Sequence, residues 1–264
     1  MTAVDRRAAF RALHEQDRLF LMPNPWDVGS ARLLAALGFE ALATTSQGFA
    51  WSIGKRDQTV TRDELVEHVA AVAAATPLPL NVDSERLYPD DSGGAAETVR
   101  LLADAGAAGC SIEDYDPAAG RLDDVETAAE RVAAAAAAKG GMTLTARCES
   151  HLYGGTDLDD TIARLVAYRD AGADVVYAPG LTDIGQIAAV VDAVAVPVNV
   201  LALPAAPTMA ELEAVGVRRA STGSLLTAAA YGGLVSGARE LLEAGTSEYA
   251  AGRVPRDLVE RAFG

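Results

Sequence analysis

The sequence predicts a (β/α)8 barrel, in which eight parallel strands alternate with helices, and three observations support this. Short apolar runs typical of buried strands alternate with longer helix-like segments along all 264 residues. No low-complexity linker divides the chain, so we expect one domain over 1–264 with a C-terminal helical extension from about 235 to 264. Four segments also share one plan, in which a helix ends at a glycine and a run of apolar or small residues follows: 34–45, 102–114, 168–180 and 212–223.

Eight segments qualify as strands because they are short, apolar and rich in β-branched or small residues. In chain order they are 18–23, 40–46, 78–83, 109–114, 142–149, 174–180, 196–202 and 218–223. Helix-like stretches lie between them, the clearest at 62–75, 125–140 and 159–172. The alternative is a doubly wound open sheet, which needs a glycine-rich phosphate turn after its first strand. Residues 22–31, MPNPWDVGSA, do not form such a turn.

The composition excludes several classes of partner. The formal net charge is −15 and the acidic residues are spread along the chain, which argues against nucleic acid or an anionic membrane as partner. No apolar run reaches the ~18 residues of a membrane-spanning helix, and the charged N-terminus lacks the apolar core of a signal peptide. Cys110 and Cys148 fit two buried thiols better than a disulfide or zinc site. We therefore expect a soluble cytoplasmic protein.

Polar side chains gather at the C-terminal ends of the predicted strands, where barrel enzymes carry their chemistry. Within strands, alternate residues share a face. This places on common faces Asn81 with Asp83 and Glu85, Ser111 with Glu113, and Thr145 with Arg147 and Glu149. If these faces point to the barrel axis, four carboxylates and one guanidinium meet at the mouth. Oxygen ligands without His or Cys suit Mg2+, with Mn2+ as a possible substitute.

Other polar residues have simpler interpretations. Asp27 either contributes to the mouth or caps the helix that begins near residue 28. Asp114 alternates away from Glu113, which predicts a loop acid or one that supports the site. Cys148 is expected in the core, and His14 and His68, in charged helical segments, at the surface.

Six motifs in order resemble the isocitrate lyase/phosphoenolpyruvate mutase superfamily, over roughly residues 15–235. The family's opening strand, helix and substrate loop resemble NPWDVGSARLLAALGFEALATTS at 24–46. GKRD at 54–57 and NVDSE at 81–85 are similar to its metal-binding segments, and SIED at 111–114 to its third acidic strand end. TARCES at 145–150 resembles the segment with its arginine, and VPVNVLA at 196–202 the strand that places an asparagine near the substrate.

This resemblance implies a barrel whose eighth helix is exchanged between subunits of a homo-oligomer, a dimer or tetramer. It implies Mg2+ held by Asp83, Glu85 and Glu113, partly through water, with Asp57 in the outer shell. Arg147 would stabilise developing charge on a small carboxylic acid substrate. The remaining substrate-binding residues implied are Thr45, Ser46, Gln47, Gly48 and Asn199.

The chain also departs from the family pattern. Lyases of the family carry a K-[KR]-C-G-H loop, whereas residues 115–126, YDPAAGRLDDVE, contain no Cys, Lys or His. Glu85 stands where Asp is usual, and Pro179 where lyases place an acid. The resemblance therefore implies an Mg2+-dependent lyase or decarboxylase that cleaves a C–C bond in a small 2-oxo or 2-hydroxy acid through a metal-stabilised enolate. The alternatives are C–P chemistry on phosphonopyruvate, or a barrel that binds a metabolite without catalysis.

Overall fold

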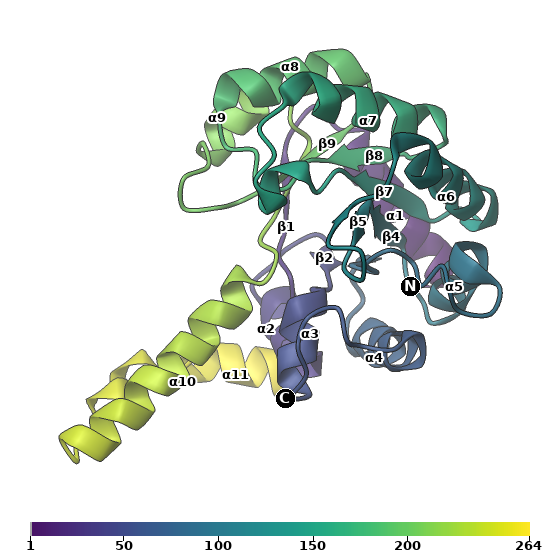
Figure 1. The fold of residues 1–264 in the computed structure, drawn as a ribbon. Coiled ribbons are helices and arrows are strands. Elements are labelled where there is room, and N and C mark those ends of the chain that lie inside the picture. Colours follow the sequence, from purple (N-terminus) through teal and green to yellow (C-terminus); the bar gives the residue numbers. More distant parts are fainter. Residues whose placement is uncertain (1) are drawn as a thin grey trace.

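Eight parallel strands form one sheet in the computed structural model, which describes residues 2–264 (Figure 1). Its order is β1-β10-β9-β8-β7-β4-β3-β2, so strands neighbouring in this series are also neighbours in space. All eight predicted strands are confirmed. Their bounds are β1 Phe20–Met22, β2 Leu42–Ala43, β3 Leu80–Val82, β4 Gly109–Glu113, β7 Thr143–Arg147, β8 Val175–Tyr177, β9 Val198–Leu201 and β10 Arg219–Ser221.

The first and last strands of this order, β1 and β2, meet and nearly close the sheet into a barrel. The Ala43 N–H donates to the Pro23 carbonyl at 3.0 Å, which joins the end of β1 to β2. Beside it, Asn24 Nδ2 donates to the Thr44 carbonyl at 2.7 Å. The predicted (β/α)8 class is thereby confirmed, and the open doubly wound alternative is excluded.

Helices surround the barrel, and their ends follow the local sequence. After α1 (Ala3–His14) they are α2 Val28–Ala36, α3 Ser46–Ser52, α4 Arg62–Ala75, α5 Gly94–Asp104, α6 Val125–Ala138, α7 Leu158–Asp170, α8 Ile184–Val194, α9 Met209–Ala214 and α10 Leu225–Glu243. Asp27 caps α2, because its Oδ1 accepts the Ser30 N–H at 2.6 Å. Of the two interpretations of Asp27, the structure supports the cap.

The four segments that share one sequence plan each contain the same kind of helix-to-strand turn. Gly38, Gly106, Gly172 and Gly216 follow α2, α5, α7 and α9, and their φ values of +94, +100, +106 and +91° are left-handed. A side chain would be strained in that conformation, so glycine ends each helix and turns the chain towards the next strand.

Helix α1 covers the N-terminal end of the barrel. Phe10 and Leu13 pack against Phe20, and arginines of α1 donate to backbone carbonyls near the ends of α4 and α5, as Arg6 does to Ala73 at 2.7 Å and Arg7 to Ala103 at 2.6 Å. This position buries the last turn of α1 beneath the strands.

The predicted surface positions of His14 and His68 are wrong. His14 is buried with its ring 5.0 Å from that of Phe20, because α1 lies across the barrel end. His68 is buried because α4 places its ring on that of Phe49, with centroids 3.8 Å apart. Cys110 and Cys148 are buried free thiols, as predicted.

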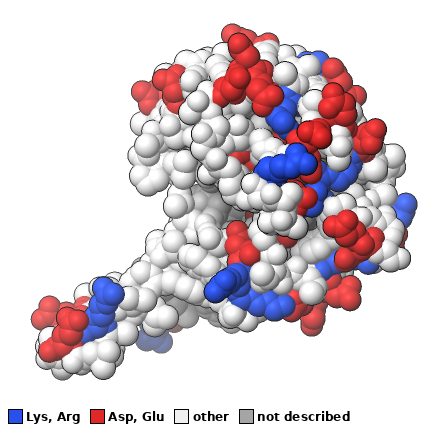
Figure 2. All heavy atoms as spheres, in the orientation of Figure 1, with Lys and Arg blue, Asp and Glu red and all other residues white. Residues whose placement is uncertain are grey.

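The C-terminal residues form an arm that leaves the barrel (Figure 1). Helix α10 projects outward, and after a 3-10 turn at Glu248–Gly252 the chain returns through α11 (Arg256–Phe263), which packs against α2. Figure 2 shows this arm standing clear of the body, with acidic and basic side chains interspersed over the drawn face. Within residues 2–264, no helix is both long and apolar enough to span a bilayer.

The segment after β4 contains a small hairpin instead of a simple loop. Strand β5 (Tyr115–Asp116) pairs antiparallel with β6 (Arg121–Leu122). The turn between them is closed by Asp116, whose Oδ1 accepts the Ala118 N–H at 2.9 Å. The stretch that departs from the family pattern is therefore an ordered element at the C-terminal end of the barrel.

Candidate active site

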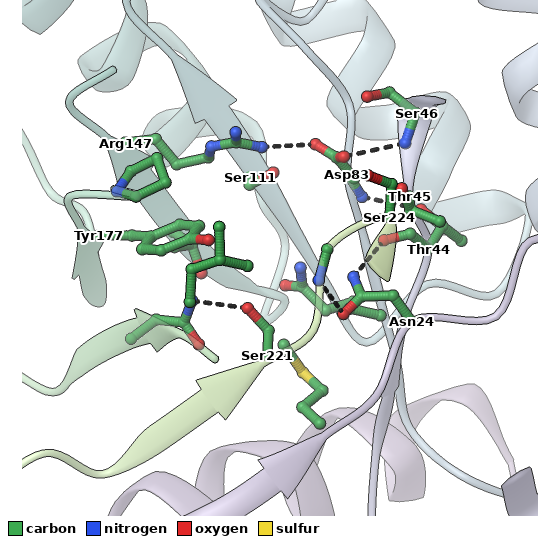
Figure 3. Close-up of a pocket in the computed structure, with 18 of the residues that line it drawn as sticks. Asn24, Thr44, Thr45, Ser46, Asp83, Ser111, Arg147, Tyr177, Ser221 and Ser224 are labelled. Carbon is green, nitrogen blue, oxygen red and sulfur yellow. Dashed lines mark hydrogen bonds and ion pairs between the residues drawn. The ribbon is translucent and has the colours of Figure 1, made fainter. Parts of the chain in front are cut away.

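A cavity of about 170 Å³ opens at the C-terminal end of the barrel, and each of the eight strands contributes to its wall (Figure 3). The interior of such a barrel is usually filled by bulky apolar side chains. Here much of the wall is small and polar, and includes Asn81, Ser111, Thr145 and Ser221. The strands thus leave room for a small polar ligand.

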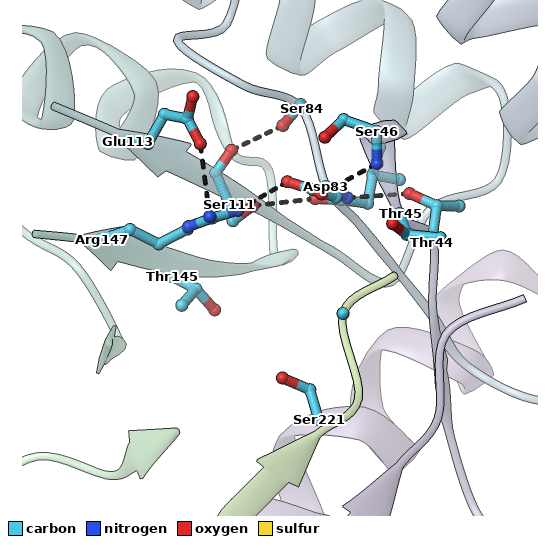
Figure 4. Close-up of polar contacts among 12 residues, drawn as sticks. Thr44, Thr45, Ser46, Asp83, Ser84, Ser111, Glu113, Thr145, Arg147 and Ser221 are labelled. Carbon is cyan, nitrogen blue, oxygen red and sulfur yellow. Dashed lines mark hydrogen bonds and ion pairs between the residues drawn. The ribbon is translucent and has the colours of Figure 1, made fainter. Parts of the chain in front are cut away.

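Arg147, the last residue of β7, is the hub of the polar contacts around this cavity (Figure 4). It contacts three carboxylates: Asp83 at 2.7 Å, Glu149 at 2.7 Å and Glu113 at 3.4 Å. Register explains one of these, because Glu113 and Arg147 are direct partners in β4 and β7. Although burial alone would lower the pKa of Arg147, the three carboxylates hold it well above its usual value.

The acids around Arg147 exceed what one guanidinium can neutralise. Burial raises the pKa of Glu113 well above its usual value and also raises that of Glu149. Burial likewise raises the pKa of Asp57, and that of Glu85 to about 8, with the charge of Asp83 adding to both shifts. All four pKa values are raised, and a bound cation would lower them again. The site is therefore short of positive charge.

The donor set fits a hard divalent cation. Asp57 Oδ1 is buried and has no hydrogen-bond partner among residues 2–264. The surrounding donors are carboxylate oxygens, which Mg2+ and Mn2+ prefer. In the described part of the chain, no three His, Cys, Asp or Glu side chains converge closely enough to form a complete metal site. A cation here would therefore take part of its coordination shell from water or substrate.

The predicted strand face that joins Asp83 to Glu85 is wrong. Strand β3 ends at Val82, and Glu85 has a left-handed φ of +49° in the turn that follows. Asp83 lines the cavity, whereas Glu85 borders an adjacent groove beside Gln58 and Tyr88. Strict alternation requires an extended backbone, which the chain leaves at residue 83.

The loop after β2 brings the predicted substrate-binding residues to the cavity. Thr45, Ser46 and Gln47 line it, and Gly48, the next residue in the chain, is buried. Two of their amides are engaged: the Ser46 N–H donates to Asp83 Oδ2 at 2.9 Å, and the Gly48 N–H to Thr45 Oγ1 at 3.3 Å. A Cβ at Gly48 would lie 2.5 Å from Thr45 Cγ2 and from Thr227 Oγ1, so only glycine fits there.

Asn199 and two residues that sequence reasoning passed over form the opposite wall. Asn199 Oδ1 accepts from Arg219 Nε at 2.9 Å, and its Nδ2 donates to Ser221 Oγ at 2.9 Å. The Tyr177 ring lies under Arg147, whose Cζ is 5.3 Å from the ring centroid. No signal in the sequence pointed to Arg219, because it begins its strand, whereas barrel enzymes carry their chemistry at the C-terminal strand ends.

Asp114 supports the site from behind, as its alternation away from Glu113 predicted. It is almost fully buried and accepts from Tyr168 Oη at 2.6 Å, from Arg164 Nη1 at 3.3 Å and from the Glu149 N–H at 2.9 Å. The last bond fixes the backbone of Glu149, whose carboxylate in turn orients Arg147. Asp114 therefore acts on the site through its neighbours.

The family model of phosphoenolpyruvate phosphomutase matches residues 10–242. The chain belongs to this family. It is 48% identical to a crystal structure from Burkholderia cenocepacia described as a lyase/mutase, with TM-score 0.93 over 99% of this chain and 97% of that one. It is 36% identical to an uncharacterised protein of Mycobacterium tuberculosis, over 82% of each chain. It is also 31% identical to an oxaloacetate decarboxylase of Paraburkholderia xenovorans, over 98% of this chain and 90% of the relative. The predicted superfamily is confirmed, and the chain is an enzyme of this group of lyases and mutases.

In this member of the phosphoenolpyruvate phosphomutase family, two loops meet at the cavity mouth. Tyr115 of the β5–β6 hairpin stacks on Tyr153 of the 3-10 turn Ser150–Tyr153, with ring centroids 3.5 Å apart. Leu152, next to Tyr153, lines the cavity. His151 turns to Thr161, with its Nε2 3.2 Å from Thr161 Oγ1. Aromatic stacking thus joins the hairpin to the cavity wall.

Proposed function

We propose that this protein is a cytoplasmic, Mg2+-dependent lyase or decarboxylase that cleaves a C–C bond in a small 2-oxo or 2-hydroxy carboxylic acid. The observation that carries the proposal is the excess of buried acid around a single arginine at the cavity mouth. A protein that only bound a metabolite would have no need for three carboxylates on Arg147 and an unpartnered Asp57 oxygen within residues 2–264.

In this proposal Asp83, Glu85 and Glu113 hold the cation partly through water, since Glu85 borders the adjacent groove, and Asp57 lies in the outer shell of the cation. The bound cation supplies Lewis-acid stabilisation for negative charge on a carbonyl oxygen. Asp83 is fixed for this role, since its two oxygens accept from Arg147 Nη1 at 2.7 Å and from the Ser46 N–H at 2.9 Å. Glu113 is fixed by Gln58 Nε2 at 2.9 Å.

Arg147 is the proposed catalytic group that faces the developing charge. Breaking the bond between the third and fourth carbons of a 2-oxo acid leaves an electron pair on the third carbon, which delocalises onto the 2-oxo oxygen as an enolate while the fourth carbon departs, as CO2 in a decarboxylation. A buried guanidinium beside that oxygen stabilises the enolate more than the ketone, because the negative charge exists only after the bond begins to break. Glu149 and the Tyr177 ring hold the guanidinium in place, so little reorganisation accompanies the step.

Carbon–phosphorus chemistry on phosphonopyruvate is the second candidate, and the family model's name favours it. A phosphonate would call for cations beyond Arg147 at the mouth. The neighbouring loop carries two cations: Lys55 is already paired with Glu64, with 2.6 Å between Nζ and Oε2, and Arg56 is exposed and does not line the cavity. We therefore place C–C cleavage first.

A substrate screen with a matched variant tests this proposal. Oxaloacetate, phosphonopyruvate, 2-methylisocitrate and 2,3-dimethylmalate are incubated with the enzyme and Mg2+, and the 2-oxo acid or phosphate released is measured. We expect turnover of a C–C substrate by the wild type and none by Asp83→Ala. Phosphate release from phosphonopyruvate alone would favour the second candidate, and equal turnover by Asp83→Ala would rule out the proposed metal site.

We also propose that the protein is a homo-oligomer, a dimer or tetramer, in which the projecting α10 packs on a second copy. Leu234, Val235, Leu241 and Leu242 on this helix are 69%, 48%, 48% and 87% exposed, and a group of exposed large apolar residues on one element is typical of an interface. Light scattering coupled to gel filtration should give a multiple of the 27.3 kDa chain mass, and Leu234→Asp with Leu242→Asp should reduce it. A monomeric wild type would contradict the proposal.

A further inference from the structure

A second buried arginine lies at the inner end of the cavity. Arg219 is 1% exposed and begins β10, and its guanidinium is held by three neutral groups. Nε donates to Asn199 Oδ1 at 2.9 Å and Nη2 to Thr145 Oγ1 at 3.0 Å. Nη1 lies 3.2 Å from His14 Nε2. These three bonds use three of the five guanidinium N–H groups.

His14 is neutral and acts as an acceptor for Arg219. Its Nδ1 lies 2.8 Å from the Phe10 carbonyl, which can only accept, so Nδ1 carries the proton and Nε2 is free to accept from Arg219. Burial, together with the nearby charge of Arg219, lowers the pKa of His14 to about 3. The histidine therefore contributes no charge at neutral pH.

Arg219 has no carboxylate partner among residues 2–264, although the chain carries 37 acidic residues. Burial lowers the pKa of Arg219 to about 9, which leaves it charged at neutral pH. Arg147, in contrast, contacts three carboxylates. A buried charge that meets only neutral dipoles is costly, and an anion that reached it would offset that cost.

The register of the sheet connects the two arginines. Arg147 pairs with Tyr177, Tyr177 with Asn199, and Asn199 with Arg219, so these four residues form one row across β7, β8, β9 and β10. All four line the same cavity. Adjacent strands lie ~4.8 Å apart, so the backbones at the two ends of the row are separated by about 14 Å along the curved sheet, and their long side chains reach inward. The cavity therefore has an acidic end that suits a cation and a basic end that suits an anion.

We propose that Arg219 binds the second carboxylate of a dicarboxylic 2-oxo or 2-hydroxy acid, whose reacting end lies at Arg147. The inference rests on the proposed function, which places the 2-oxo end at the acidic mouth. The polar wall supplies further donors for this carboxylate, since Ser221 and Thr145 line the cavity on either side of Asn199. Arg219 is thus a specificity-determining residue that selects dicarboxylic over monocarboxylic acids.

A structural role for Arg219 makes a different prediction. Through His14 the arginine also ties α1 to the barrel, so its removal could loosen the fold without affecting ligand choice. Arg7 is a matched control, because it ties α1 to the carbonyls of Ala103 and Ala107 and does not line the cavity. Arg7→Met and Arg219→Met each remove one positive charge from a contact between α1 and the rest of the barrel, and only the second removes a charge from the cavity.

The test measures binding by calorimetry in the presence of Mg2+, with malate, lactate and 2-hydroxy-3-phosphonopropionate as probes. We expect malate to bind the wild type roughly 10- to 100-fold more tightly than lactate, the range for a charge-assisted hydrogen bond. Arg219→Met should lower malate affinity to that of lactate and leave lactate unchanged. Arg7→Met should keep the full preference, and Arg219→Lys should keep part of it.

Several outcomes would overturn the inference. They are equal binding of malate and lactate by the wild type, equal loss of both in Arg219→Met, loss of the preference in Arg7→Met, and tighter binding of the phosphonate than of malate. If Arg219→Met does not fold, the inference is tested by the malate-to-lactate affinity ratio of the wild type and by the change of that ratio in Arg219→Lys. Because binding is measured without turnover, a malate preference without any cleavage would refute only the proposed reaction. Cleavage without the preference would refute only the role of Arg219.

Discussion

Replacing Arg147 by Met tests whether the folded protein needs a positive charge among the buried acids at the cavity mouth. The substitution keeps the length of the side chain and leaves Asp83, Glu149 and Glu113 without their common partner. Removing one member of a buried ion pair costs ~3–5 kcal/mol, and the three contacts share one residue, so we expect this range rather than three times it. For a chain of this size each kcal/mol moves the melting temperature by about 2–4 °C, which predicts a fall of roughly 6–20 °C.

The cation should partly rescue this variant, because the released carboxylates become available to it. We expect Mg2+ to raise the melting temperature of Arg147→Met more than that of the wild type. Lower pH should also stabilise this variant. The folded pKa values of Glu113, Glu149 and Glu85 lie above their unfolded values, so the stability they contribute is lost as pH rises. Without Arg147 the variant should therefore gain stability, relative to the wild type, as pH falls from 8 towards 5.

The assay is thermal denaturation at both pH values, with and without Mg2+, and with Arg86→Met as control. Arg86 is as buried as Arg147, with side-chain exposures of 16% and 14%, and it pairs with Asp116 and Asp123 away from the cavity. Because Asp123 keeps its contact with Arg131, the control should lose less stability and gain nothing from Mg2+. An Arg147→Met protein as stable as the wild type, or equal effects of Mg2+ on both variants, would refute the reasoning.

Three further predictions concern residues around the site. Asp114→Asn should cost ~1–3 kcal/mol in denaturant unfolding and lower kcat more than it raises KM, because it loosens Glu149 and thereby Arg147; an unchanged kcat would contradict this role. The pKa of His14 is about 3 in the folded state, against an ordinary value of 6.5. Between these two pH values the unfolded chain binds more protons than the folded one. The free energy of unfolding therefore falls as pH falls through this window, by up to ~1.4 kcal/mol per pH unit. His14→Gln should flatten that acid limb in denaturant titrations, and an identical slope would show that the histidine does not cause it. Tyr115→Ala removes a stacking contact of ~0.5–1.5 kcal/mol and should raise KM about 2- to 10-fold in steady-state assays, with no change expected if the hairpin lies apart from the substrate.

The strands and their helix-ending glycines were predictable because they follow from local chemistry. Gly38 and Gly172 have positive φ in the structure, a conformation that favours glycine over every other residue. The position of Arg147 was equally predictable, because it ends an apolar run and the extended backbone carries it to the barrel mouth. These features depend on a few neighbouring residues, which the sequence shows directly.

Other features depend on contacts between distant segments and could not be predicted. Glu85 leaves the predicted strand face because it, Leu87 and Tyr88 all adopt left-handed φ, a cost that only the surrounding packing explains. His14 and Arg219 are 205 residues apart, so neither sequence position indicates the pairing that buries both at the barrel end. An arginine at the start of a strand is also uninformative until the register places it beside Asn199 in the cavity wall.

The most direct test of the proposed function is turnover of the identified 2-oxo or 2-hydroxy acid before and after removal of divalent cations. Product release is followed after exhaustive chelation and dialysis, and again after Mg2+ or Mn2+ is restored. We predict that chelation abolishes activity, that either cation restores it, and that Asp83→Ala cannot be restored. Full turnover by the chelated wild-type enzyme would contradict the assignment of Asp83, Glu85 and Glu113 as a metal site.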